Sequence, residues 1–290
     1  MGNLILLQHQ VLERFREGGL FERVMHSGGH MDRMKGLLRL MSEPPHEGDQ
    51  RPFFFCPDLR SQPFYPPDVI PACSHLMMKA ASIIAEWRQN RSGLVTYTPQ
   101  TSGPVGPTQI GLWQMALLRY MGAPGSAAFV FPETAAVTND MPRFTGGYPW
   151  GDALFSVHGP GTRLHPHCSV DNFRVRIHLG IDVPQDAQLR VHDQVQHWQA
   201  GQCLAFDDSF EHETHNGSGE RVVLIVDTWH PDLSDAETEF LTAAFNHRQV
   251  KALFFDRRLK NTNISDDELR QLSDGQAHLH EQALASGWWS

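Results

Sequence analysis

The sequence predicts a mainly β protein, with an all-β barrel or sandwich at its centre and helical segments on both sides. Between about residue 112 and residue 231, short apolar runs alternate with Pro, Gly, Asp and Asn, which is the spacing of short strands and turns. Before and after this stretch, apolar residues recur every three or four positions, which is typical of amphipathic helices.

The first forty residues predict two helices, over 3 to about 41, divided at Gly28 and Gly29. The Pro-rich passage 42–71 is too rich in proline for regular structure over most of its length. We expect an ordered loop there, because leaving its aromatic residues in water would be costly; they are Phe53, Phe54, Phe55, Phe64 and Tyr65.

A helix is predicted from His75, where the 3.6-residue period returns. The segment 172–182 reads as a strand with an apolar face and a polar face, because its residue types alternate. After Trp229 two further helices are expected. Ser265 and Glu268 have the spacing of a capping box that opens the second of these helices.

The composition is that of a soluble globular protein: 290 residues, 40% hydrophobic and 20% charged, with a formal net charge of −9. The acidic balance and the lack of a basic stripe argue against a nucleic-acid partner. The apolar patch 4–7 is too short for a signal peptide or a membrane span, and no later run reaches the roughly 18 apolar residues a membrane helix needs. We therefore expect a cytoplasmic protein that binds neither membranes nor nucleic acid.

Four cysteines, at positions 56, 73, 168 and 203, show no CxxC spacing. This pattern indicates neither a zinc knuckle nor a disulfide framework. Reduced, mostly buried thiols are expected.

Two segments carry the chemistry: HPHCSVDNFRVRIHLG, which contains His167, and FDDSFEHETHNGSGERVVLIVDTWHP, which contains His212. Each histidine stands where a strand meets a turn, and Arg221 opens a further strand. Two imidazoles can hold a divalent metal and an arginine can hold a carboxylate, a combination that indicates a non-haem iron oxygenase using 2-oxoglutarate. The usual carboxylate ligand, two residues after the first histidine, is replaced by Ser169.

Histidine alone is weak support for a metal site here, because the chain has 17 histidines. The wider pattern is more specific. From FPET at 131–134 through PGTRLHPH at 160–167, NFRVRIHLG and FDDSFEHE to RVVLIVDTWHP, with a fainter echo in LRSQPFY at 59–65, the sequence resembles the aspartyl/asparaginyl β-hydroxylase family.

The resemblance implies a double-stranded β-helix core, also called a jelly-roll or cupin-like fold, that uses Fe(II), 2-oxoglutarate and O₂. On this basis we expect a helical and Pro-rich extension over 1–110, the oxygenase core over 111–233 and a helical extension over 234–290. These extensions would shape substrate access or form a homodimer.

Carried over position by position, the resemblance makes His167 and His212 the iron ligands. Ser169 stands where this family has a small residue that does not bind the metal, glycine in the members compared. Water is then the expected occupant of the vacant position, and Ser169 either matters through its hydroxyl or simply fills a turn.

The resemblance also assigns the cosubstrate and substrate contacts. Arg221 would pair with the distal carboxylate of 2-oxoglutarate, assisted by Ser156. Arg176 and His178 would lie near its inner carboxylate, and Arg174, together with Arg176, would contact the substrate. An anionic amino-acid side chain is the expected substrate group for these two arginines.

Three nearby aspartates, Asp171, Asp207 and Asp208, are interpreted as turn-capping residues rather than substitute metal ligands. The pattern assigns no role to His158, His165 or Cys168. Trp229, His230 and Pro231 are expected to close the barrel.

The implied reaction is hydroxylation of the β-carbon of an aspartate, asparagine or related amino acid, with release of succinate and CO₂. The amino acid would be free, peptide-bound or tethered to a carrier. Two alternatives stay open. The same fold could halogenate or desaturate its substrate, since the missing carboxylate leaves room for a halide, or it could be a non-catalytic cupin-like module that binds a metal or small acid.

Overall fold

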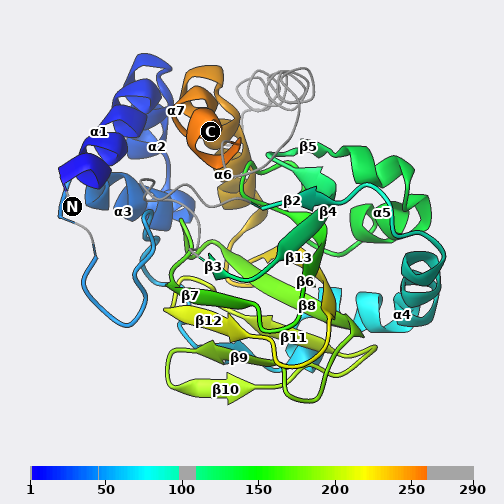
Figure 1. Cartoon of the computed structure of the whole chain (residues 1–290). Helices are drawn as coiled ribbons and strands as arrows, with labels where there is room; N and C mark the ends of the chain where they lie inside the picture. Colours follow the sequence, from blue (N-terminus) through cyan, green and yellow to red (C-terminus); the bar gives the residue numbers. More distant parts are fainter. Residues whose placement is uncertain (1, 45, 98–108, 260–290) are drawn as a thin grey trace.

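The computed structural model describes residues 2–44, 46–97 and 109–259. Its centre is formed by two antiparallel sheets, one in front of the other in Figure 1. The larger sheet has the order β1 (Phe64–Tyr65), β11 (Cys203–Phe206), β8 (Arg174–Asp182), β13 (Arg221–Trp229), β6 (Ala153–His158), β4 (Trp113–Tyr120) and β2 (Val95–Thr96), with β5 (Ala123–Pro124) beside β4. The smaller sheet has the order β10 (Gln194–Gln196), β9 (Gln188–Val191), β12 (His212–His215), β7 (Arg163–His167) and β3 (Gln109–Ile110).

Helices flank these sheets on two sides (Figure 1). They are α1 (Gly2–Glu17), α2 (Leu20–His26), α3 (Asp32–Leu40), α4 (Pro71–Gln89), α5 (Pro132–Asn139), α6 (Asp235–Asn246) and α7 (Arg248–Leu259), with short 3₁₀ helices η1 (Gly29–Met31), η2 (Pro67–Val69) and η3 (Ser126–Phe129). The prediction of a mainly β, double-stranded β-helix core with flanking helices is confirmed.

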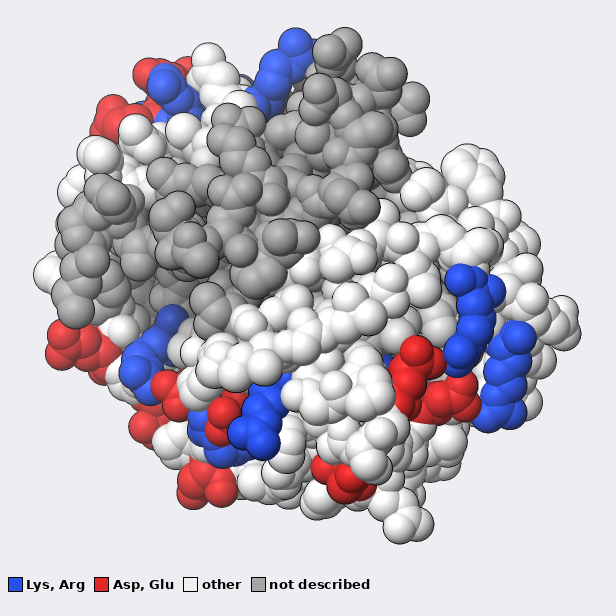
Figure 2. Space-filling view, in the orientation of Figure 1, with Lys and Arg blue, Asp and Glu red and all other residues white. Residues whose placement is uncertain are grey.

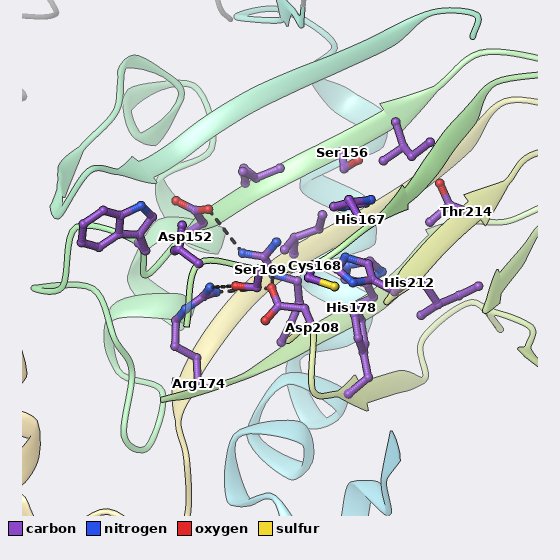
Figure 3. A pocket seen from close by; sticks show the side chains of 18 of the residues that line it. Asp152, Ser156, His167, Cys168, Ser169, Arg174, His178, Asp208, His212 and Thr214 are labelled. Carbon is purple, nitrogen blue, oxygen red and sulfur yellow. Dashed lines mark hydrogen bonds and ion pairs between the residues drawn. The ribbon is translucent and has the colours of Figure 1, made fainter. Parts of the chain in front are cut away.

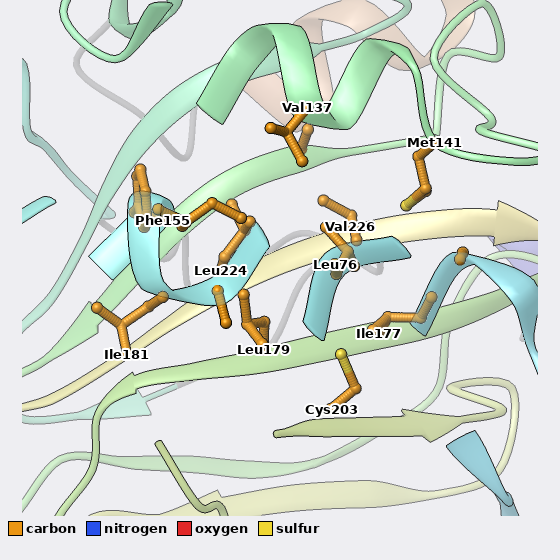
Figure 4. Close-up of a cluster of buried hydrophobic side chains, with 14 of the residues drawn as sticks. Leu76, Val137, Met141, Phe155, Ile177, Leu179, Ile181, Cys203, Leu224 and Val226 are labelled. Carbon is orange, nitrogen blue, oxygen red and sulfur yellow. The ribbon is translucent and has the colours of Figure 1, made fainter. Parts of the chain in front are cut away.

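The alternation along β8 positions the core and the cavity on opposite faces of the larger sheet. In the predicted strand 172–182, the five residues of the apolar face are fully buried: Phe173, Val175, Ile177, Leu179 and Ile181. Most of them join apolar residues of β6, β13, α4 and α5 in one cluster, drawn in Figure 4. The predicted apolar face of this strand is thus confirmed, and its polar face points to the other sheet.

A second apolar cluster joins the two ends of the described chain. Phe15 of α1 packs edge-on against Phe240 and Phe245 of α6, with ring centroids 6.4 and 5.5 Å apart. Arg33 of α3 pairs with Glu237 of α6 at 2.7 Å. Glu237 also completes a capping box with Ser234 at the start of α6, which the sequence analysis did not identify.

Several local predictions need correction. The first helical segment is broken at Gly18 and Gly19 as well as at Gly28, because Gly19 takes a left-handed conformation with φ of 69°. The helix α4 begins at Pro71 rather than His75, with proline at the first helical position where its missing N–H costs nothing. Helix α5 was not predicted. Ser265 and Glu268 lie outside the described residues.

The described residues of the Pro-rich passage form a mostly irregular, ordered segment, as expected. Phe54 and Tyr65 are buried anchors, while Phe53, Phe55 and Phe64 are half-buried. Phe64 and Tyr65 also form the edge strand β1, which the prolines around them had hidden.

Cys56, Cys73 and Cys203 are buried free thiols and Cys168 is a half-buried one, in agreement with the prediction. On the face shown in Figure 2, the described acidic and basic side chains are intermixed rather than separated. Within the described ranges, no helix combines the length and apolar character needed to cross a bilayer.

Candidate functional site

A cavity of about 480 Å³ lies between the two sheets. The polar face of β8 contributes Arg174, Arg176 and His178, and the facing sheet contributes His167 and His212 (Figure 3). The cavity thus brings together the seven residues assigned from the sequence, which also include Ser156 and Arg221.

The two predicted metal ligands lie side by side on neighbouring strands. His167 ends β7 and His212 begins β12, and the two are register partners in the ladder. Their ring centroids are 4.1 Å apart. Backbone pairing of two strands therefore fixes the distance between the imidazoles.

The hydrogen bonds of these rings leave one nitrogen of each available for a metal. Nδ1 of His167 lies 2.7 Å from the carbonyl of His165, and Nδ1 of His212 lies 3.0 Å from the carbonyl of Phe210. A carbonyl only accepts, so each Nδ1 carries the proton and each Nε2 keeps its lone pair. A metal bound by two histidines needs one free imidazole nitrogen from each. The Nε2 atoms of His167 and His212 meet this requirement, so the pair fits a metal site.

Both imidazoles are neutral at physiological pH. Burial, followed by the neighbouring His212, lowers the pKa of His167 to about 3. Burial likewise lowers the pKa of His212 to about 4, with Arg176 and Arg174 adding to the shift. Neutral imidazole is the form that binds metals, so protonation does not compete at pH 7.

In the described part of the chain, no three His, Cys, Asp or Glu side chains gather as a metal-binding group. A metal at the histidine pair would thus take its remaining ligands from water or small molecules. Ser169 does not fill this role, because its hydroxyl accepts a hydrogen bond from Nη2 of Arg174. The hydroxyl is engaged with an arginine, so Ser169 does more than occupy a turn.

Arg174 and Arg176 reach the cavity, but aspartates already surround them. Asp227 receives two hydrogen bonds from Arg176, at 2.9 and 2.8 Å, and lies 3.1 Å from Arg174. Asp171 pairs with Arg174 at 3.0 Å, and Asp152 lies 3.4 Å from Arg176. The two arginines predicted to contact the substrate are therefore held in a network of buried ion pairs.

The aspartates differ in their roles. Asp207 and Asp171 cap turns as expected, accepting from the backbone N–H of Ser209 at 2.9 Å and of Phe173 at 3.2 Å. Asp208 departs from that expectation. Its carboxylate lines the cavity and lies 3.5 and 3.3 Å from Arg174 and Arg176, and no hydrogen bond reaches its Oδ1 from the described residues.

Arg221 presents the opposite situation, because it is a buried cation that no described carboxylate neutralises. Its exposure is 1%, and no carboxylate in the described residues lies within ion-pair distance. The ring of Trp198 covers the guanidinium at 4.8 Å, and burial lowers the pKa of Arg221 to about 9. The group is still charged at pH 7, so this end of the cavity attracts an anion.

Ser156 and His178 add hydrogen-bond donors beside Arg221. The hydroxyl oxygen of Ser156 accepts from Trp113 Nε1 at 3.0 Å and from Arg221 Nη2 at 3.1 Å, which leaves its O–H free to donate. His178 Nδ1 accepts from Trp198 Nε1 at 3.3 Å. Since an indole only donates, the proton of His178 sits on Nε2, which has no partner among the described residues.

Among the site residues that the sequence did not reveal are Trp113 and Trp198, along with the aspartates Asp152 and Asp227 described above. The pairing of Trp113 with Ser156 crosses two adjacent strands, β4 and β6. Trp198 reaches Arg221 and His178 from the loop after β10, and no periodic pattern marks that loop. For Trp113, the signal was its place at the start of a strand whose alternate residues face inward.

Comparison with known proteins supports the resemblance. The family model described as aspartyl/asparaginyl β-hydroxylase matches residues 79–231, more than half of the chain. The chain belongs to the aspartyl/asparaginyl β-hydroxylase family. The matched range contains β6 to β13, and with them both histidines and Arg221.

Relatives show the same domain within longer chains. Aspartate β-hydroxylase domain-containing protein 1 of Mus musculus is 36% identical over 204 residues, 68% of this chain and 57% of that protein. Domain-containing protein 2 of Xenopus tropicalis is 34% identical, over 66% of this chain and 54% of that protein. The human aspartyl/asparaginyl β-hydroxylase is 34% identical over 47% of this chain and 17% of its own length. The chain thus spans about half the length of the domain-containing relatives.

Solved structures resemble this fold only in part. A prolyl-4-hydroxylase from Pseudomonas putida has a TM-score of 0.30 at 15% identity, covering 59% of this chain and 90% of that chain. The Escherichia coli ribosomal oxygenase YcfD has a TM-score of 0.29 at 15% identity, covering 80% and 64%. Similarities this limited add nothing to the family assignment.

Proposed function

We propose that this protein is an Fe(II)- and 2-oxoglutarate-dependent hydroxylase that acts on the β-carbon of an aspartate, asparagine or related amino acid. The observation that carries the proposal is the buried Arg221, whose guanidinium has no carboxylate within ion-pair distance among the described residues. Membership of the β-hydroxylase family supports the reaction class. The two neutral imidazoles 4.1 Å apart support a metal near the other end of the cavity.

Arg221 and Ser156 would hold the distal carboxylate of 2-oxoglutarate. A guanidinium grips a carboxylate with parallel N–H groups, and the free O–H of Ser156 supplies a further donor. Trp198 shields this pairing from water, which strengthens it because the local dielectric is low. Trp113 fixes the direction of the Ser156 hydroxyl by occupying one of its lone pairs.

Nε2 of His167 and His212 would hold the iron, whose reaction with O₂ and the 2-oxo acid supplies the oxidising chemistry. The chain's own contribution is orientation. His178 offers its Nε2–H to a cosubstrate lying between Arg221 and the histidine pair. Arg176 is held toward the same space by Asp227.

The substrate would enter beside Arg174 and Arg176. The N–H groups of Arg174 are not fully used, because its Nη1 makes no well-aligned hydrogen bond with the described residues. A substrate amide or carboxylate could bind there. Asp208 and Asp152 on the same wall would favour an amino group on the same molecule.

Succinate release tests the proposal. The purified protein with Fe(II), ascorbate and 2-oxoglutarate is offered free amino acids, peptides and thioester-tethered amino acids. His167→Ala, His212→Ala and Arg221→Ala should abolish turnover, whereas the exposed controls His9→Ala and Arg88→Ala should not. Binding of cobalt(II) and of 2-oxoglutarate gives an independent readout. Undiminished turnover in a folded Arg221→Ala protein would refute the assignment.

Halogenation is a second candidate, favoured by one observation. The position that carries the third ligand in other oxygenases is Ser169, and its hydroxyl is engaged by Arg174. A halide could therefore bind beside the histidine pair. The product mass, measured with and without chloride, separates halogenation and desaturation from hydroxylation. Iron binding without succinate from any substrate offered would instead indicate a binding module.

A further inference from the structure

His158, which the sequence pattern left without a role, lies at the end of the cavity next to Arg221. It ends β6 two residues after Ser156, so the two side chains point to the same side of the sheet. Ser156 and His158 both line the cavity, whereas the alternate residues Phe155 and Val157 face the apolar core. The strand therefore presents Ser156 and His158 together.

The neighbouring strands place His158 among the residues of the proposed carboxylate site. Its register partners are Arg221 on β13 and Trp113 on β4. Its ring meets Trp113 edge-on, with centroids 5.8 Å apart. Burial lowers the pKa of His158, and Arg221 and His178 lower it further, so the ring is neutral and carries one N–H donor.

This donor is unused. His158 is fully buried, and neither of its ring nitrogens has a hydrogen-bond partner among the described residues. Buried polar groups in native proteins are nearly always paired, so each exception calls for an explanation. The Nε of Arg221 and the Nε2 of His178 are unpaired as well. Hydrogen-bond donors on β6, β8 and β13 thus surround one end of the cavity, and they have no acceptor within the described part of the chain.

We propose that His158 donates its ring N–H to the distal carboxylate of 2-oxoglutarate, beside Arg221 and Ser156, and so helps to select 2-oxo diacids over 2-oxo monoacids. This inference rests on the proposed function. An anion at this end of the cavity satisfies the guanidinium and the imidazole at once, which explains why the histidine is buried without a hydrogen-bond partner among the described residues.

Two substitutions separate hydrogen bonding from packing. His158→Leu fills the same space without a donor, and His158→Gln keeps an N–H. His9→Gln, on the exposed face of α1, is the matched control. Dissociation constants for 2-oxoglutarate and for 2-oxobutyrate, which lacks the distal carboxylate, are measured with the manganese(II)-loaded protein. Intrinsic tryptophan fluorescence, to which Trp113 and Trp198 beside Arg221 contribute, reports binding. Thermal unfolding of the unliganded protein is recorded in parallel.

The proposal predicts that His158→Leu weakens 2-oxoglutarate binding roughly tenfold, the loss expected for a hydrogen bond to a charged group, and leaves 2-oxobutyrate binding unchanged. His158→Gln should stay within about threefold of the wild type. The midpoint of unfolding of His158→Leu should be equal or higher, because an unpaired buried polar group has been removed.

Equal affinity of His158→Leu and the wild type for 2-oxoglutarate would overturn the inference and leave the proposed function intact. A lower unfolding midpoint in both variants, with both 2-oxo acids weakened alike, would assign His158 a structural role and also overturn it. A wild-type protein that binds no 2-oxoglutarate would overturn the inference and the proposed function together.

Discussion

Replacing Asp227 by Asn should destabilise the protein strongly. Asp227 is fully buried and accepts from Nε and Nη2 of Arg176 and from the backbone N–H of Asp152, at 2.8 to 3.0 Å. It also lies 3.1 Å from Nη1 of Arg174. An asparagine side chain has the same shape as aspartate but no charge to place between Arg174 and Arg176. The N–H groups of its amide would also face the N–H groups of the two guanidiniums.

The expected loss of unfolding free energy depends on the carboxylates that remain beside the two arginines. Breaking a buried ion pair by removing one partner typically costs about 3–5 kcal/mol. Asp171 and Asp208 stay near the two arginines, so we expect the lower end, about 3 kcal/mol. The matched control is Asp182→Asn, which breaks an exposed pair with Arg88 and should cost less than about 1 kcal/mol.

Urea unfolding measures both variants, with the free energy of unfolding taken from midpoint and slope. Burial raises the pKa of Asp227, but Arg176 and Arg174 outweigh it and hold the pKa below its usual range. The stability that this carboxylate provides is therefore present above about pH 4 and is lost as the pH falls through the lower folded pKa. A difference from wild type below about 1 kcal/mol at pH 7 would refute the reasoning.

Three further predictions concern single residues. Burial raises the pKa of Asp207 to about 7. As the pH rises from about 4 to 7, the wild type should therefore lose stability relative to Asp207→Asn, by at most about 1.4 kcal/mol per pH unit in urea unfolding. A difference in the free energy of unfolding that does not change with pH would contradict this. Glu237→Gln should lower the free energy of unfolding by about 2–3 kcal/mol, because Arg33 and the α6 cap both lose their carboxylate, and an unchanged midpoint would contradict it. Trp198→Leu should weaken 2-oxoglutarate binding roughly tenfold in titration calorimetry, because Arg221 loses its covering ring and becomes hydrated; wild-type affinity would show that the ring is dispensable.

Much of the architecture could be predicted because it is encoded locally. The alternation along β8 separates a core face from a cavity face, and the same two-residue period places Ser156 in the cavity. His167 and His212 were identified through the family resemblance, and the structure shows them as register partners.

The pairing of charges could not be predicted in this way. The sequence shows Arg174 and Arg176 on one face of a strand, but not that Asp227 lies between them, because that contact spans more than fifty residues. The left-handed turn at Gly19 was missed for a different reason: the apolar period continues across it. Local patterns thus identify the groups in the site, whereas tertiary contacts decide which of them are already neutralised.

The contact between the first helices and α6 has a consequence for synthesis on the ribosome. Arg33 and Glu237 are separated by 204 positions, so α3 leaves the ribosome long before its partner has been made. At roughly 5–20 residues per second, the apolar faces of α1 and α3 wait on the order of 10–40 s for α6. During that interval Phe15 and its neighbours lack the α6 rings that bury them in the folded protein.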